Sequence, residues 1–115
     1  MIKAVFTEDE EGRLVKYSIK GHAKYSPFGT DIVCAAVSAL AISTANGIVA
    51  YCDTDIESET SDNGEMVINV LHPNDKSNVL ISSMMLGMQS IAETYKNNVE
   101  LTLEAPEVIA EDGWN

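Results

Sequence analysis

A long apolar segment between Asp31 and Asp53 limits more than any other feature how this chain can fold. The segment is dense in alanine, isoleucine, valine and leucine and contains no proline, so one continuous helix is expected over it. Asp31 or Thr30 can cap the first turn by accepting a hydrogen bond from an orphan amide. Apolar residues run almost all the way round the helical wheel. This predicts a helix covered on more than one side, by a sheet and by a loop or a second subunit.

Extended segments are expected on both sides of this helix. Residues 2–8 and a second alternating stretch that ends near Gly21 predict a hairpin around an acidic turn. A second hairpin is expected from Ile56–Thr60 and residues 66–71, because the intervening Asn63-Gly64 pair tolerates the positive φ of a tight turn.

A second helix is expected over residues 75–97, with Asn74 as its cap. Its apolar residues predict an amphipathic stripe that consists of Val79, Leu80, Met84, Leu86, Met88, Ile91 and Tyr95. Alternation from position 99 to 103 predicts a last strand, and the acidic residues 105–115 are expected to form a loosely held tail. The order ββαββαβ predicts a single α+β domain over residues 1–115, with two helices packed on one sheet.

The charge balance restricts the partners of this chain. Its 115 residues include 18 acidic and 7 basic side chains, which gives a formal net charge of -11. Such a surface repels phosphate backbones and anionic lipid headgroups, so neither nucleic acid nor a membrane is an expected partner. A basic protein is a better one. The charged start of the chain does not resemble an export signal, which predicts a cytoplasmic protein whose cysteines are thiols.

A histidine and a cysteine flank the loop before the first helix. Cys34 is expected in the first helical turn, where unpaired amides and the helix macrodipole stabilise a thiolate. His22 lies at the mouth of the loop, and the eight residues between His22 and Asp31 span at most about 27 Å, so the two side chains can meet. In that arrangement Cys34 attacks an acyl carbon and His22 protonates the leaving amine. Spacing alone also permits an ordinary buried cysteine and a hydrogen-bonded histidine.

Cys52 and His72 suggest a metal site as an alternative. Cys52, however, is expected about 27 Å from Cys34, near the other end of the same helix, where the macrodipole disfavours a thiolate. It is therefore expected to be structural, and His72 to be a surface turn residue. No familiar metal-ligand spacing is present, so neither a metal nor another cofactor is expected.

The segment Gly21-His22-Ala23, followed by Gly-x-Asp-Ile-Val-Cys-Ala-Ala-x-Ser from position 29 to 38, strongly resembles the ribosomal-processing cysteine protease family Prp, also called YsxB-like. The likeness extends over essentially the whole chain. It implies a homodimeric endopeptidase that removes an N-terminal extension from a basic protein of the large ribosomal subunit, with His22 and Cys34 as the catalytic pair.

Further residues match that motif or adjoin it. Gly21, Asp31 and Ser38 match positions that the resemblance makes supports of the site. Tyr25 and Phe28 lie on the loop that precedes the helix, and this loop is expected to close over a bound peptide and to contribute apolar contacts. The alternative function is a non-enzymatic, dimeric acidic adaptor that binds a basic ribosomal protein.

Overall fold

The computed structural model describes residues 1–21, 32–62 and 64–106. Five strands and two helices follow one another in the predicted order ββαββαβ, which is confirmed. They are β1 (Ile2–Glu8), β2 (Leu14–Lys20), α1 (Ile32–Tyr51), β3 (Ile56–Thr60), β4 (Met66–Val70), α2 (Asp75–Thr94) and β5 (Val99–Glu104). The expected tail lies outside the described residues beyond position 106.

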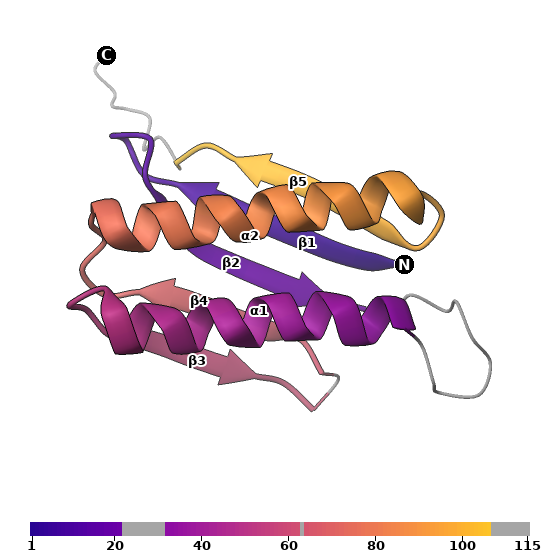
Figure 1. The fold of residues 1–115 in the computed structure, drawn as a ribbon, viewed down its shortest axis with the longest axis horizontal. Coiled ribbons are helices and arrows are strands. Elements are labelled where there is room, and N and C mark those ends of the chain that lie inside the picture. The colour runs from indigo at the N-terminus through magenta and orange to yellow at the C-terminus, as the bar shows by residue number, and fades with distance from the viewer. Residues whose placement is uncertain (22–31, 63, 107–115) are drawn as a thin grey trace, which may run out of the picture.

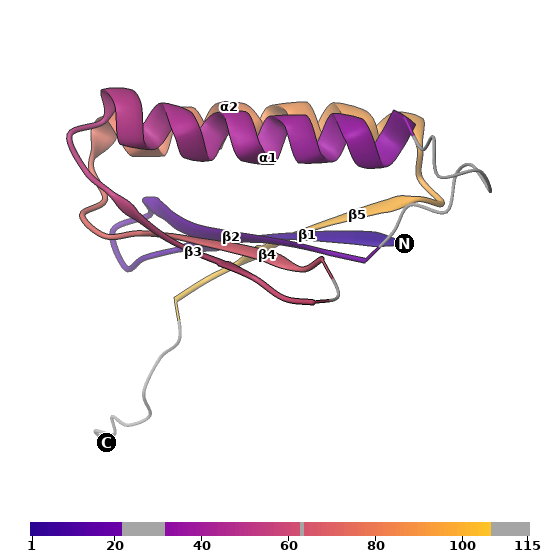
Figure 2. The ribbon, with the colours of Figure 1, turned by 90° about the horizontal axis from the view of Figure 1, so that it is seen from below.

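The strands form one sheet in the order β3-β4-β2-β1-β5 (Figure 1). All neighbouring pairs are antiparallel except β1 and β5, which run parallel. Both helices lie on the same face of the sheet, as Figure 2 shows. Side chains of a strand alternate between the two faces, so Ile2, Ala4 and Phe6 are buried beneath the helices.

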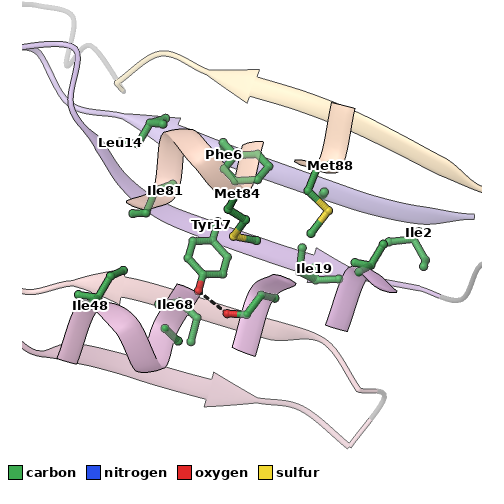
Figure 3. Packing of buried hydrophobic residues seen from close by; sticks show 14 of the residues in the cluster. Ile2, Phe6, Leu14, Tyr17, Ile19, Ile48, Ile68, Ile81, Met84 and Met88 are labelled. Atoms are coloured by element: carbon green, nitrogen blue, oxygen red, sulfur yellow. Dashed lines mark hydrogen bonds between the residues drawn. The ribbon is translucent and has the colours of Figure 1, made fainter. Parts of the chain in front are cut away.

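The core lies between the sheet and the two helices (Figure 3). Tyr17 on β2 is fully buried, and its hydroxyl donates a hydrogen bond of 2.7 Å to the carbonyl oxygen of Ala41 on α1. Burial raises the pKa of the Tyr17 phenol well above its usual range, because a phenolate would lose its hydration there. This bond therefore joins α1 to the central part of the sheet.

One side of α1 packs on the sheet through Val33, Val37, Ala41, Ala45 and Ile48. By length and composition alone α1 is apolar enough to cross a membrane, with a mean hydropathy of 2.0. This core side accounts for part of that apolar character. α2 covers a second side of α1, in place of the loop or second subunit that the sequence predicts, and large apolar side chains elsewhere on α1 remain exposed.

The second helix begins where the sequence predicts. The side chain of Asn74 accepts a hydrogen bond from the backbone of Ser77, whose hydroxyl in turn accepts one from the Asn74 amide, forming a capping box. The helix ends at Thr94, three residues earlier than expected. The predicted stripe is wrong at Val79 and Leu86, which are 63% and 65% exposed.

The residues of α2 that are buried against the sheet are Ser77, Ile81, Met84 and Met88. These positions are spaced by three and four residues, so they form one face of the helix. Ile81 was therefore missing from the predicted stripe. The periodicity fits more than one face, because the outward-pointing residues are as apolar as the buried ones.

Candidate active site

Cys34 is the third residue of α1 and lies in its first turn, as the sequence predicts. It is half-buried and packs against the edge of the core. Val33 and Val37 are each 1% exposed, so they fix the rotation of this turn against the sheet. The first amides of a helix point out of its end and favour negative charge. Cys34 thus lies at the start of α1 with part of its side chain accessible.

Gly21 follows β2 and precedes His22 in the sequence. Its φ is +92°, a conformation that residues with a side chain rarely adopt. A Cβ atom at this position would also collide with the carbonyl oxygen of Met1. Only glycine fits here, which gives a physical reason for the first residue of the Gly-His-Ala motif.

The ends of three strands meet beside Gly21. β1 lies between β2 and β5, and the amide of Ile2 donates a hydrogen bond of 2.8 Å to the carbonyl oxygen of Asn98. The start of α1, the end of α2 and the N-terminus of the chain lie at the same end of the molecule in Figure 1. Cys34 and Gly21 thus belong to one end of the domain, bordered by Met1 and Asn98. No local pattern predicts this border, because it depends on the pairing of the first strand with the last.

Of the other predicted site residues, only Ser38 is among those that the structure describes. Ser38 lies one turn after Cys34 on α1 and is exposed. His22, Asp31, Tyr25 and Phe28 lie outside the described residues. The structure therefore places Gly21, Cys34 and Ser38 toward one end of the domain, and the site that they would form with His22 stays a prediction.

Cys52 has the structural position that the sequence predicts. Its side chain is 1% exposed, and it follows the last residue of α1. The amide of Cys52 donates to the carbonyl oxygen of Ile48, while its own carbonyl oxygen accepts a hydrogen bond of 2.7 Å from the Asn74 side chain. Cys52 thus connects the end of α1 with the start of α2, at the opposite end of α1 from Cys34.

His72 is exposed between β4 and α2, as expected for a surface turn residue. Its amide donates a hydrogen bond of 2.9 Å to the hydroxyl of Thr54. Within residues 1–21, 32–62 and 64–106, no three histidine, cysteine or acidic side chains come together in a way that could hold a metal ion.

Comparison with known proteins identifies the family. The family model described as cysteine protease Prp matches residues 1–100. The ribosomal processing cysteine protease Prp of Staphylococcus aureus is 30% identical over 103 residues, which cover 88% of this chain and 97% of that protein.

Two solved structures of the essential ribosomal processing protease Prp from S. aureus have the same fold. The structure with a covalently linked product peptide has a TM-score of 0.84 and 29% identity, and it matches 90% of this chain and 100% of its own. The structure with a substrate peptide has a TM-score of 0.81 and 27% identity, with the same coverage. The fold, the motif around Cys34 and these matches agree, and the chain belongs to the cysteine protease Prp family.

Proposed function

We propose that this cysteine peptidase removes the N-terminal extension of a large-subunit ribosomal protein, with Cys34 as its nucleophile and His22 as its general acid and base. The observation that carries the proposal is the position of Cys34, half-buried in the first turn of α1 at the end of the domain where Gly21 lies. The S. aureus relatives are described as ribosomal processing proteases, and two of their structures hold a peptide.

The proposed reaction is an acyl transfer through a thioester. The Cys34 thiolate attacks the carbonyl carbon of the scissile peptide bond, and amides at the start of α1 stabilise the oxyanion that forms. The carbon–nitrogen bond then breaks, and the leaving amine takes a proton from the His22 imidazolium. In the second half, the imidazole accepts a proton from a water molecule that attacks the thioester. A carboxylic acid leaves, and the thiolate and the imidazolium are restored.

The remaining predicted residues support this chemistry. Asp31 caps the helix that carries Cys34, and Ser38 hydrogen-bonds near the site one turn further along α1. Tyr25 and Phe28 contact the peptide from the loop that closes over it. An Asp31→Asn variant tests the capping role by its stability and by the rate at which Cys34 is alkylated. Unchanged stability together with an unchanged or faster rate removes that role.

Charge guides the substrate to the enzyme. Ribosomal proteins are basic, and a chain with a net charge of -11 attracts them over the Debye length of about 8 Å at physiological ionic strength. The association rate therefore falls as salt is added. The same charge repels RNA, which favours processing in the cytoplasm before the substrate joins the ribosome. As the family resemblance implies, the enzyme acts as a homodimer.

Incubating the purified chain with the extended ribosomal protein of its own organism tests this function. We expect the wild type to cut once within the N-terminal region, and Cys34→Ala to bind the substrate without cutting it. Cys52→Ala serves as a matched control, because Cys52 is buried at the opposite end of α1. It should cut normally at a temperature where it stays folded.

Alkylation with iodoacetamide, followed by mass spectrometry, tests the chemistry separately. Cys34 should react much faster than Cys52 and faster than free glutathione. If Cys34→Ala cleaves as the wild type does, Cys34 is not the nucleophile. If neither chain cleaves but both bind, the adaptor function stands instead.

A further inference from the structure

The face of the sheet that is turned away from the helices carries a group of lysines. No helix of the described residues covers this face, as Figure 2 shows. Three of the seven basic residues of the chain lie on it, Lys3 on β1 and Lys16 and Lys20 on β2, and all three are exposed. They alternate along their strands with residues buried beneath the helices, so their side chains point to the opposite face. We call these three residues the lysine strip.

The charges of the lysine strip repel one another. Lys3 and Lys20 are direct partners in the pairing of β1 with β2, and like charges directly opposite each other destabilise a sheet. The salt bridges between described residues have only Arg13 and Lys76 as their cations, so no described carboxylate pairs with the strip. This is unexpected in a chain with 18 acidic residues. An anion bound over the strip would relieve the repulsion.

A hollow of about 310 Å³ lies over the lysine strip. Val5, Thr7 and Ser18 line it between the three lysines, and Glu65 and Glu104 also line it. Val5 is half-buried, so the hollow offers an apolar contact as well as positive charge. An occupant that fits the hollow therefore combines carboxylates with apolar side chains.

Carboxylates confine the lysine strip on both sides. By strand register, the edge strands β3 and β5 carry four glutamates on the same face: Glu57, Glu59, Glu100 and Glu104. Neighbouring strands lie about 4.8 Å apart, so the positive strip across β1 and β2 is about 10 Å wide. A single extended chain fits this width. The phosphates of a nucleic acid duplex would extend beyond it and meet the glutamates.

The C-terminal residues 107–115 have the composition that the hollow requires. Glu107, Glu111 and Asp112 provide carboxylates, and the segment contains no lysine, arginine or histidine. It also contains apolar residues, including Trp114. This segment is therefore complementary to the lysine strip in charge and to Val5 in polarity.

The segment follows β5, which ends beside the hollow. Glu104 is the last residue of β5, and Glu104, Thr7 and Lys16 form one row across β5, β1 and β2. Lys16 is thus two strand spacings, about 10 Å, from the end of β5. That end lies on the side of the sheet away from the helices in Figure 2. Nine extended residues span up to about 30 Å, so residues 107–115 are long enough to follow the whole strip.

We propose that residues 107–115 dock on the lysine strip of their own chain. A short tether gives the segment a local concentration in the millimolar range, so a few exposed ion pairs suffice to hold it. The lysines would repel a basic protein, and the docked segment covers them with carboxylates. This inference does not depend on the proposed cleavage, since neither His22 nor Cys34 takes part in it.

Trp114 allows docking to be measured directly, because it is the only tryptophan of the chain. The assay is acrylamide quenching of its fluorescence at low salt and in about 1 M sodium chloride, where the Debye length is about 3 Å. In the wild type, quenching should be about threefold stronger at high salt, because screening releases the segment from the strip.

Substitutions identify the surface that protects Trp114. At low salt, Lys16→Glu should raise quenching about threefold, to the level of the wild type at high salt. Lys96→Glu is the matched control: it changes the net charge equally, but Lys96 is exposed between α2 and β5 and does not line the hollow. Glu111→Lys combined with Asp112→Lys should release Trp114 without altering the described fold. Circular dichroism establishes that each variant is folded.

Several results would overturn the proposal. They are quenching that salt does not change in the wild type, or release of Trp114 by Lys96→Glu as large as by Lys16→Glu. Protection that fades on dilution from about 100 to about 1 µM would show that the segment of another copy is bound instead. Tight binding of a single-stranded RNA oligonucleotide, lost in Lys16→Glu, would show that phosphates occupy the strip. Cleavage of the ribosomal protein is a separate measurement, so its failure leaves these outcomes distinguishable.

Discussion

Replacing Gly21 by alanine separates the backbone requirement of the site from the general cost of losing a glycine. The matched control is Gly12→Ala, because Gly12 has a similar φ of +84° but nothing within 4 Å of the added methyl group. An alanine at such a φ costs about 1–2 kcal/mol, and its smaller unfolded-state entropy returns about 0.4–1 kcal/mol. Gly12→Ala should therefore destabilise the chain by about 1 kcal/mol.

Gly21→Ala carries an additional cost. Its methyl group meets the carbonyl oxygen of Met1, which is backbone and cannot rotate away as a side chain would. Overpacking of this kind costs about 1–3 kcal/mol, so the total should reach about 2–4 kcal/mol. Relief requires Met1 to move, and this strains the hydrogen bond between Ile2 and Asn98.

Gly21→Ala should also lower the activity of the folded enzyme, beyond what its loss of stability explains. Gly21 is joined directly to His22, so a shift of about 1 Å at this point misplaces the proposed general acid and can cost about 100-fold in rate. Urea unfolding gives the two free energies, and kcat/KM for peptide cleavage, measured where both variants are folded, gives the activities. We expect Gly12→Ala to keep full activity. Equal losses of stability and full activity in both variants would refute the reasoning.

Three further substitutions test the scaffold, each by chemical unfolding. Tyr17→Phe should lower the free energy of unfolding by about 1 kcal/mol below pH 10, because it removes the hydrogen bond to Ala41. Above pH 10 the phenol ionises in the unfolded chain, while burial keeps the pKa of Tyr17 raised in the folded chain. The wild type should therefore lose up to about 1.4 kcal/mol of stability per pH unit from this group, and the variant should not. A parallel pH dependence in both chains would contradict this. Asn74→Ala should lower the free energy of unfolding by about 1–2 kcal/mol, since it removes the cap of α2 and the hydrogen bond to the Cys52 carbonyl oxygen. An unchanged unfolding midpoint would show that the cap does not stabilise the fold. Ile81→Ala should lower the free energy of unfolding by about 2–5 kcal/mol, because Ile81 is fully buried. Leu103→Ala is the control and should cost about 1 kcal/mol or less, because Leu103 is half exposed. Similar losses in the two variants would mean that α2 turns a different face to the sheet.

Local features were predictable from the sequence where a few neighbouring residues decide the structure. The Asn74 cap and the placement of Cys34 in the first turn both follow from side chains within one helical turn. Gly64 has the positive φ of +82° that its turn was expected to need. The position of Cys34 relative to its helix was therefore predicted correctly.

Features that depend on distant parts of the chain were not predictable in this way. The parallel pairing of β1 with β5 joins residues almost a full chain length apart, and it places Asn98 beside the site. The buried side of α2 was misjudged because Val79 and Leu86 are as apolar as Ile81 and Met84. Periodicity gives the spacing of a stripe, but which side of α2 is buried depends on where the sheet lies, and the sheet is built from distant parts of the chain.

Three parts of the apolar helix α1 differ in their physical role: the side that faces the sheet, the N-terminal end and the outer side. Its sheet-facing side buries valines on both sides of Cys34, and full burial of such a side chain contributes about 1.5–3 kcal/mol, which keeps the first turn from fraying. Its N-terminal end then holds the Cys34 side chain in one place, as the proposed role of a nucleophile requires. Its outer side is left apolar, which costs solubility in an isolated chain and is stabilising only if that side is covered.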